Sequence, residues 1–309
     1  MTGEAHAMDG AATTRWLIVG VDGTDSSRHA LEWAAQQALL RELALRIVVS
    51  AGARAPVGAF GAHLPSESVP PGEAGTPSAE RLLEQAADWV SRLFPELEVQ
   101  SRLSYTRPLD ALLAEAAEPG AAAVVVGSRG LKGIVAAFVG SVGIELAARS
   151  PVPVVIMPHE HAFAHGVRGR VIVGVDGSEP SRRAVGFAFA QAAFAETDLV
   201  AVSAWQPLVA FAAATGPIPP ELFDDSTAEE AARGSLEEEV GAARLRHPGV
   251  RVLQRVVRAH PVVALLEEAT PADLIVVGSR GRSGFRGLLL GSVSHSVVHG
   301  AKGPVAILR

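Results

Sequence analysis

Short apolar segments without polar alternation recur along the chain, and each is followed by a longer segment of helical periodicity. Residues 16–21 and 45–50 are two such apolar segments, and they predict buried strands. Between them, the polar residues 24–26 offer N-caps for an Ala-rich helix that reaches about residue 41. Buried strands separated by helices are typical of a parallel sheet covered on both faces. The pattern therefore predicts a doubly wound α/β fold.

The same alternation continues after the second strand. The Gly- and Pro-rich residues 51–77 predict a long loop, which in compact domains is usually functional or disordered. The elements expected after it are a helix at 78–93, a strand at 97–104, a helix at 108–117, a strand at 122–126, a helix at 141–149 and a strand at 152–157. This order returns in the rest of the chain, through residues 306–308.

Two duplicated blocks divide the chain. The block Trp-Leu-Ile-Val-Gly-Val-Asp-Gly-Thr at residues 16–24 returns as Arg-Val-Ile-Val-Gly-Val-Asp-Gly-Ser at 170–178, a spacing of 154. The block Val-Val-Val-Gly-Ser-Arg-Gly at 124–130 returns as Ile-Val-Val-Gly-Ser-Arg-Gly at 275–281, a spacing of 151. A period of this size is a whole duplicated domain, because solenoid repeats have periods of about 20 to 50 residues.

The duplication predicts the domain organisation. We expect a flexible tail at residues 1–14, a first domain at 15–158, a polar, Gly-containing linker at 159–169 and a second domain at 170–309. Each domain is expected to contain a five-stranded parallel sheet with helices on both faces. The final strands, residues 153–156 and 304–307, are the expected edges of the two sheets.

The composition of the chain disfavours several classes of binding partner and of site. The 309 residues carry a net charge of −6, which gives no broad positive field for nucleic acid or an anionic membrane. The absence of cysteine excludes disulfides, Cys-ligated zinc and a thiol nucleophile, and is compatible with a reducing compartment. Residues 1–14 lack the pattern of a signal peptide, and the apolar stretch 121–140 is too polar for a membrane span. We expect a cytoplasmic protein.

A glycine pattern at the end of the fourth strand carries the strongest chemical signal. It reads Gly127-x-x-Gly130, nine residues and Gly140-Ser141, and it returns as Gly278-x-x-Gly281, nine residues and Gly291-Ser292. Such glycines permit positive φ and let a polyphosphate approach main-chain N–H groups. The serines are expected to begin helices, whose N-termini favour an anion. A single G-x-x-G is more often only a tight turn, but its duplication in both halves favours binding.

Charged residues beside the glycines leave alternatives open. Asp22 and Asp176 could hold Mg²⁺ or a ribose hydroxyl, or could instead cap the following helix through Thr24 or Ser178. The side chains that could neutralise phosphate charge, or be solvated loop residues, are Arg129, Lys132, Arg280 and Arg282.

The Val-Asp-Gly-Thr/Ser block and the duplicated glycine pattern together resemble the ATP-binding form of the universal stress protein family, over nearly the whole chain. The resemblance implies a flavodoxin- or Rossmann-like fold in each half and pairing of the two halves through their final strands. It also implies these nucleotide-binding residues: Gly20, Asp22, Ala51, Gly127, Ser128, Arg129, Gly130, Leu131, Lys132, Gly133, Gly140, Ser141, Val142, Gly174, Asp176, Ala204, Gly278, Ser279, Arg280, Gly281, Arg282, Ser283, Gly284, Gly291, Ser292, Val293 and Ser294.

The function implied by the resemblance is a nucleotide-dependent sensor or regulator of a stress or dormancy response. It would bind one ATP per domain, with Mg²⁺ at Asp22 and Asp176 as the candidate metal site, and would form a homodimer. The alternatives are a slow ATPase or phosphotransferase, and an interaction scaffold with degenerate pockets. Neither a Walker A loop nor G-x-G-x-x-G is present, and no duplicated base stands beside the glycines, so no catalytic residue is assigned.

Two further features are expected to have no chemical role. His159, His161 and His165 lie in the linker and are interpreted as polar linker residues. The Glu-rich run at residues 229–239 is expected to be the exposed face of a helix.

Overall fold

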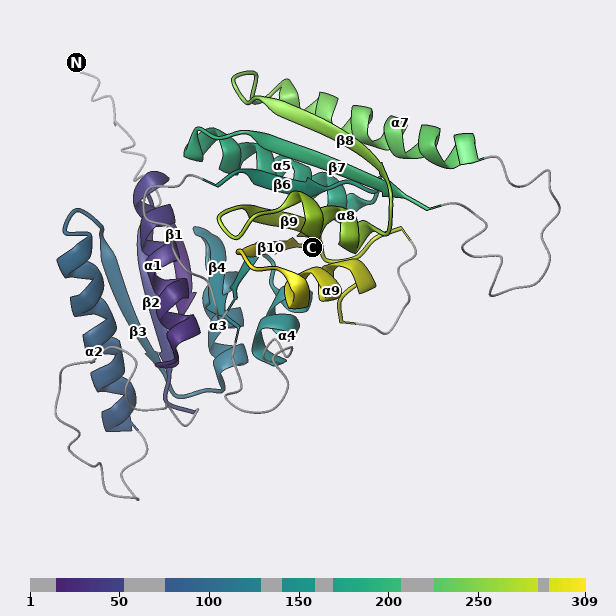
Figure 1. Cartoon of the computed structure of the whole chain (residues 1–309). Coiled ribbons are helices and arrows are strands. Elements are labelled where there is room, and N and C mark those ends of the chain that lie inside the picture. Colours follow the sequence, from purple (N-terminus) through teal and green to yellow (C-terminus); the bar gives the residue numbers. More distant parts are fainter. Residues whose placement is uncertain (1–14, 53–75, 129–140, 159–168, 207–224, 283–288) are drawn as a thin grey trace, which may run out of the picture.

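The computed structural model describes residues 15–52, 76–128, 141–158, 169–206, 225–282 and 289–309 (Figure 1). Its strands form one ten-stranded sheet with the order β3-β2-β1-β4-β5-β10-β9-β6-β7-β8. The first five strands belong to the first half of the chain and the last five to the second half. The order of the second half therefore mirrors that of the first.

The first half follows the predicted order. Its elements are β1 (Trp16–Gly20), α1 (Asp25–Leu40), β2 (Ala44–Ser50), α2 (Thr76–Leu93), β3 (Val99–Ser104), α3 (Pro108–Ala117), β4 (Ala121–Gly127), α4 (Ser141–Arg149) and β5 (Val154–Met157). All four strand pairs within this half are parallel. The largest shifts from the predicted bounds are two residues, at the starts of α2, β3 and β5.

The second half repeats this arrangement. Its elements are β6 (Val171–Gly174), α5 (Glu179–Ala195), β7 (Leu199–Trp205), α7 (Asp225–Arg244), β8 (Val252–Arg258), α8 (Pro261–Glu268), β9 (Leu274–Gly278), α9 (Ser292–Gly300) and β10 (Val305–Leu308). Its strand pairs are again parallel. The predicted fold class, two doubly wound α/β units with five parallel strands each, is confirmed.

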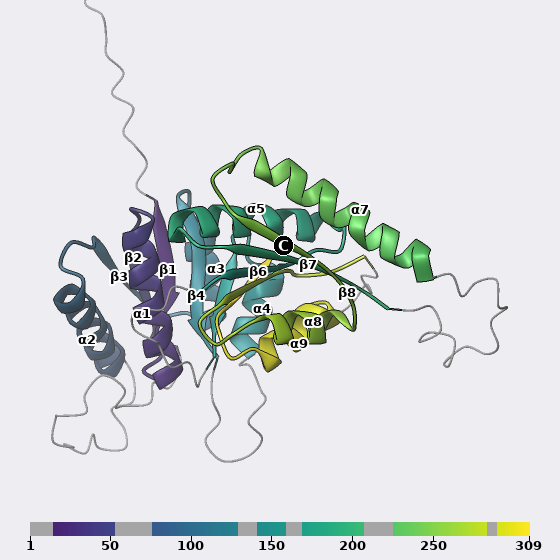
Figure 2. The same cartoon turned by 45° about the horizontal axis from the view of Figure 1, so that its top comes forward.

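The sheet is buried because helices cover both of its faces. Alternate strand residues point to opposite faces, so Leu17 and Val19 join one core cluster while Ile18 joins the other. One cluster contains side chains of α1, α2, α5 and α7, and the other contains side chains of α3, α4, α8 and α9. Figure 2 shows these two layers in the second half, with α5 and α7 on one side of the strands and α8 and α9 on the other. The near-continuous apolar strands follow from this double coverage.

The two halves join through their last strands. β5 and β10 pair antiparallel, with Val305 opposite Ile156 and Ile307 opposite Val154. This is the pairing that the resemblance implied. On one face of the sheet, the side chains of Gln37 in α1 and Gln191 in α5 hydrogen-bond to each other, at equivalent positions 154 residues apart. A contact between equivalent residues is what a two-fold arrangement of the halves produces.

Some predictions fall outside the described residues. These are the tail 1–14, most of the loop 51–77 and the linker histidines. Within the described residues, no helix is both long enough and apolar enough to cross a membrane.

Candidate functional site

Each half has a cavity beyond the carboxyl ends of its strands, where ligands bind in open α/β sheets. The cavity of the first half measures about 410 Å³ and that of the second half about 520 Å³. Cavities of about 300 to 1,000 Å³ suit small-molecule ligands. We call them the first and the second cavity.

The turn after the first strand of each half borders its cavity. In the second half, the Asp176 carboxylate accepts a hydrogen bond from the Ser178 backbone N–H at 3.0 Å, and the Ser178 hydroxyl accepts one from the Ser181 N–H at 3.3 Å. In the first half, Asp22 accepts hydrogen bonds from the Thr24 N–H and hydroxyl, at 3.1 and 2.6 Å. The capping alternative for both aspartates is therefore realised. Each still lines its cavity, so the capping role and a ligand contact are compatible.

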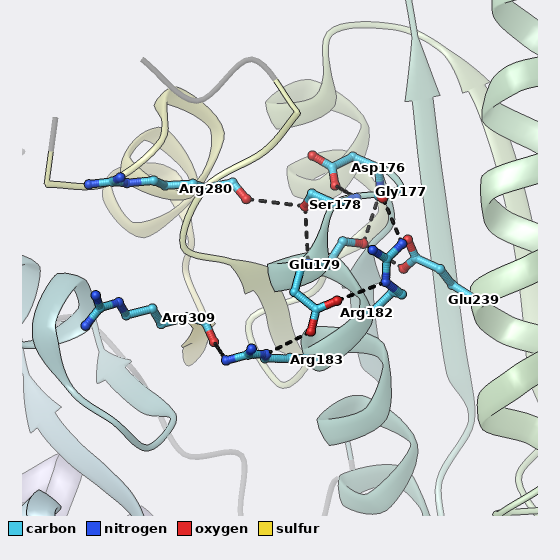
Figure 3. A network of polar contacts seen from close by, with 10 residues as sticks. Asp176, Gly177, Ser178, Glu179, Arg182, Arg183, Glu239, Arg280 and Arg309 are labelled. Carbon is cyan, nitrogen blue, oxygen red and sulfur yellow. Dashed lines mark hydrogen bonds and ion pairs between the residues drawn. The ribbon is translucent and has the colours of Figure 1, made fainter. Parts of the chain in front are cut away.

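The glycine loop of the second half is closed at its base. The Gly291 N–H donates to the Ser279 carbonyl at 2.8 Å, and the Ser294 hydroxyl donates to the same carbonyl at 3.0 Å. The Ser178 hydroxyl also reaches the Arg280 carbonyl at 3.4 Å (Figure 3). These bonds hold the two ends of the loop together and join it to the turn that contains Asp176.

The glycines in these loops serve close approach rather than unusual backbone angles. Among the described glycines, positive φ values occur at Gly23 and Gly177, in the turns after β1 and β6, and at Gly120, just before β4. At Gly127, an added Cβ would lie 2.5 Å from the Ser26 carbonyl carbon, and at Gly281 it would lie 2.5 Å from the Asp176 carboxylate. The expectation of positive φ at the described loop glycines is therefore wrong, because the backbone there packs directly against the following helix and turn.

A helix N-terminus faces each cavity. α9 has Gly291 as its N-cap, which offers no side-chain cap, and the second cavity is lined by Gly291, Ser292, Val293 and Ser294. α4 begins at Ser141, and Ser141 and Val142 line the first cavity. The first N–H groups of a helix lack intrahelical partners and carry partial positive charge. Both cavities thus offer an anion-binding end.

Another part of each cavity wall is apolar. In the second cavity it is formed by Val202, Ala204, Pro261, Leu265 and Val277. In the first cavity it is formed by Val48, Pro108, Ala111, Leu112 and Val126. A ligand with one flat apolar part and one anionic part matches this division.

A family model described as the universal stress protein family matches residues 14–158 and, a second time, residues 168–309. The chain belongs to the universal stress protein family. A universal stress protein of Mycolicibacterium smegmatis is 34% identical, with 97% of this chain and 98% of that protein covered. One from Mycobacterium tuberculosis is 33% identical, with 98% and 97% covered. The relatives are therefore tandem proteins of the same length class.

Solved structures of universal stress proteins share the fold of the whole chain. The crystal structure of a universal stress protein from Archaeoglobus fulgidus matches with a TM-score of 0.57 at 18% identity, and covers 96% of this chain and 99% of its own. A putative universal stress protein from Pseudomonas aeruginosa matches with a TM-score of 0.63 at 15% identity, and covers 96% and 93%.

Most of the residues proposed from the universal stress protein resemblance line the cavities. In the second cavity these are Gly174, Asp176, Ala204, Gly278, Arg280, Gly281, Arg282, Gly291, Ser292, Val293 and Ser294, and in the first they are Gly20, Asp22, Gly127, Ser141 and Val142. Ser128 and Ser279 instead anchor their loops to the sheet, through N–H bonds to the Met157 and Leu308 carbonyls. Arg129, Gly130, Leu131, Lys132, Gly133, Gly140, Ser283 and Gly284 lie outside the described residues.

The strand register corrects the pairing of Ala51 with Ala204. Gly20 lies opposite Val48, and Gly174 lies opposite Val202, so β2 and β7 correspond at a spacing of 154. The counterpart of Ala204 is therefore Ser50, which lines the first cavity, while Ala51 packs into the core on the other face. A slip of one residue along a strand moves a side chain to the opposite face.

The sequence reasoning missed part of the site. The apolar wall from α3 and α8 was not assigned, although Pro108 and Leu112 recur as Pro261 and Leu265 at a constant spacing of 153. Ser27 and Ser181, which correspond at the repeat spacing of 154, also line the cavities. Among the described residues no cluster of three potential metal ligands occurs, and the Mg²⁺ role of Asp22 and Asp176 stays a prediction.

Proposed function

We propose that this universal stress protein binds ATP in each of its two cavities and acts as a nucleotide-dependent sensor or regulator. The observation that carries the proposal is the same division in both cavities, with an apolar wall on one side and a helix N-terminus with a glycine turn on the other. The apolar wall suits an adenine ring, and the N–H groups of α4 and α9 suit phosphate oxygens. Asp22 and Asp176 are the candidate partners of the ribose or of Mg²⁺.

The attachment of the glycine loops supports a sensor role. The Ser128 N–H donates to Met157, the last residue of β5, at 2.7 Å, and the Ser279 N–H donates to Leu308, the last residue of β10. β5 and β10 are the strands that join the two halves. A ligand that displaces either loop therefore also shifts the β5–β10 pairing. The size of this shift is set by the difference in the ligand's affinity for two arrangements of that pairing.

The proposal also covers the cell and the assembly. Two domains, at residues 15–158 and 170–309, are joined by the linker 159–169, and the chain works in the cytoplasm as a homodimer. β5 and β10 already pair with each other, so association of two chains would use other surfaces. The net charge of −6 supports a partner that is neither nucleic acid nor an anionic membrane.

The test is a pair of charge substitutions, one in each cavity. Ser141→Glu and Ser292→Glu place a carboxylate where a phosphate is proposed, and an acidic residue in the first turn of a helix does not harm the helix. We expect each variant to lose about one of the two ATP molecules that mass spectrometry would quantify after denaturing the purified chain. Ser296→Glu is the matched control, because it lies on α9 outside the cavity and Glu145 occupies the equivalent position of α4.

The outcomes separate the alternatives. Two ATP molecules per chain in the Ser296→Glu control and one in each cavity variant support the proposal. Copurified ADP together with turnover that each cavity variant lowers, and that the two substitutions combined abolish, would favour a slow ATPase. No nucleotide in the unmodified chain, even after titration with millimolar ATP, would overturn nucleotide binding and favour a scaffold.

A further inference from the structure

A buried carboxyl group stands behind the second cavity. Glu239 of α7 is 4% exposed, although the Glu-rich run that contains it was expected to be solvated. It falls in the buried stripe of α7, next to Leu236 and Val240. One carboxylate oxygen accepts a hydrogen bond from the Ser181 hydroxyl at 2.8 Å, and within the described structure the other is buried without a hydrogen-bond partner.

Glu239 is connected to the cavity through one hydroxyl group. Ser181 lines the second cavity, and its Oγ accepts a hydrogen bond from the Asp176 backbone N–H at 3.2 Å. Ser181 therefore lies between Asp176 and Glu239, and the orientation of its hydroxyl depends on the acceptor that Glu239 provides. Figure 3 shows Glu239 reaching from α7 towards Gly177 at the start of α5.

The first half lacks this carboxyl group. The buried residues of α2 and α7 correspond at a spacing of 153, which places Ala86 where the second half has Glu239. Ser27, the counterpart of Ser181, donates its hydroxyl to the Thr24 carbonyl at 2.9 Å instead. Asp22 and Arg28 stand where the second half has Asp176 and Arg182, so those charges are common to both halves.

The surroundings of Glu239 disfavour its charged form. Burial raises the pKa of Glu239, the Ser181 hydrogen bond lowers it, and the nearby Asp176 carboxylate raises it again. Arg182 and the Gly177 backbone N–H lower this pKa, but Arg182 also binds Glu179 at 3.1 Å.

The strands beneath α7 add apolar groups to this region. β7 and β8 contribute Leu199, Ala201, Val252 and Val256 to the core cluster that contains Leu236 and Val240. The charges of Arg258 and Asp225 pair with each other at the far end of α7, roughly 20 Å along the helix from Glu239.

We propose that Glu239 is a positioning residue that makes anion binding in the second cavity, and not in the first, depend on its state of protonation. The inference rests on the proposed binding of ATP. Phosphate bound beside the Asp176 turn repels the Glu239 carboxylate, so uptake of a proton by Glu239 and binding of the anion favour each other. The affinity of the second cavity for ATP therefore rises as pH falls. The first cavity has no carboxyl group at this position, so its affinity lacks this pH dependence.

The experiment compares the two cavities one at a time. Ser141→Glu leaves the second cavity to be measured, and Ser292→Glu leaves the first. ATP is titrated calorimetrically from about pH 8 to about pH 5.5, in buffers of different ionisation enthalpy. This pH range lies above the ordinary pKa of the introduced carboxyl groups. As pH falls, we expect the affinity for ATP to rise on the order of tenfold more in the second cavity than in the first. We also expect ATP binding to take up more protons in the second cavity than in the first.

Two variants isolate the carboxyl group. Glu239→Gln keeps an acceptor for Ser181 but removes the charge, so the second cavity should acquire the pH profile of the first and bind ATP more tightly at about pH 8. Glu239→Ala copies Ala86 and should also remove the extra pH dependence. Glu239→Gln tests the charge alone, and its comparison with Glu239→Ala tests the hydrogen-bond acceptor. Circular dichroism reports whether each variant keeps its fold.

The results distinguish this inference from the proposed function. Equal pH profiles in the two cavities, or a profile that Glu239→Gln leaves unchanged, would overturn the role of Glu239 while ATP binding stands. No ATP binding in either single-cavity variant or in the unmodified chain would overturn both proposals together.

Discussion

The two halves of the chain pair the same partly buried acid with arginines from different positions. In the first half, Arg46 of β2 is 5% exposed, binds Glu115 at 2.7 Å and lies 3.7 Å over the Trp16 ring. In the second half, Val200 replaces that arginine and Arg170, at the position of Trp16, binds Glu268 at 3.1 Å. Both halves keep an arginine on this glutamate although the arginine stands at different positions, because a partly buried carboxylate without a partner is costly.

The end of the sheet that carries the cavities shows the opposite behaviour. There the backbone arrangement is shared, down to the aspartate turn and the serine after it, but the charge behind the turn differs. Ala86 keeps the first cavity free of the carboxyl group that Glu239 brings to the second. The two halves thus both pair a glutamate with an arginine at the amino ends of their strands, whereas the charges at the carboxyl ends differ between them.

The largest expected effect comes from the buried ion pair. Arg46→Ala leaves Glu115 and Gln100 without their partner, and should lower the free energy of unfolding by about 3 kcal/mol. Urea denaturation followed by circular dichroism measures the loss. A double-mutant cycle with Glu115→Ala should recover part of it, and strictly additive effects would show that the pair is not coupled.

A smaller effect is expected at the loop glycines. An added Cβ at Gly127 meets the Ser26 backbone at 2.5 Å, whereas one at Gly278 meets Pro180 at 2.9 Å. Gly127→Ala should cost about 2 kcal/mol and Gly278→Ala about 1 kcal/mol in unfolding free energy. Gly20→Ala is the control, since its Cβ meets only side-chain atoms, those of Leu112 and Val126, at 3.1 Å or more. A larger loss for Gly20→Ala than for Gly127→Ala would contradict the close-approach explanation.

Glu239→Gln should stabilise the protein. Because burial raises the pKa of Glu239 in the fold, wild-type stability declines as pH rises through that pKa, and the neutral amide escapes this decline. The gain should appear as a higher Tm at about pH 8 and should vanish towards about pH 4. Thermal melts at several pH values measure it, and a gain that grows as pH falls would have the wrong sign.

The smallest effect concerns an exposed ion pair on the same helix. Arg233 binds Glu229 at 2.9 Å, and both side chains are largely exposed. Arg233→Ala should change the unfolding free energy by less than about 0.5 kcal/mol, since such pairs are screened by water. A loss comparable with that of Arg46→Ala in the same urea assay would remove the distinction between buried and exposed pairs.

Sequence patterns predict the repeated frame of this protein well because they depend on periodicity and on duplication. The strands, the helix starts at Ser141 and Ser292 and many of the cavity residues follow from the duplicated pattern. The mistakes lie between the blocks. The spacing changes from 154 to 151, so an alignment without strand pairing cannot tell whether Ser50 or Ala51 faces the cavity.

Other misassignments have different physical causes. Positive φ occurs at Gly23, Gly120 and Gly177 rather than at the described loop glycines, and a glycine pattern does not reveal which of its members lies in a turn and which packs against backbone. The burial of Glu239 was hidden because α7 contains four other glutamates, and helical phase alone separates Glu239 from them. Three-dimensional packing, not composition, identifies that residue.

The antiparallel pairing of β5 with β10 also determines which other strands can pair with this chain. A half produced alone would expose a row of unpaired backbone N–H and C=O groups on its last strand, which any strand of similar pattern could occupy. Covalent linkage supplies the matching strand at an effective concentration in the millimolar range. The tandem arrangement therefore favours pairing of the two halves with each other over pairing with another chain, and it keeps the two cavities together in one molecule.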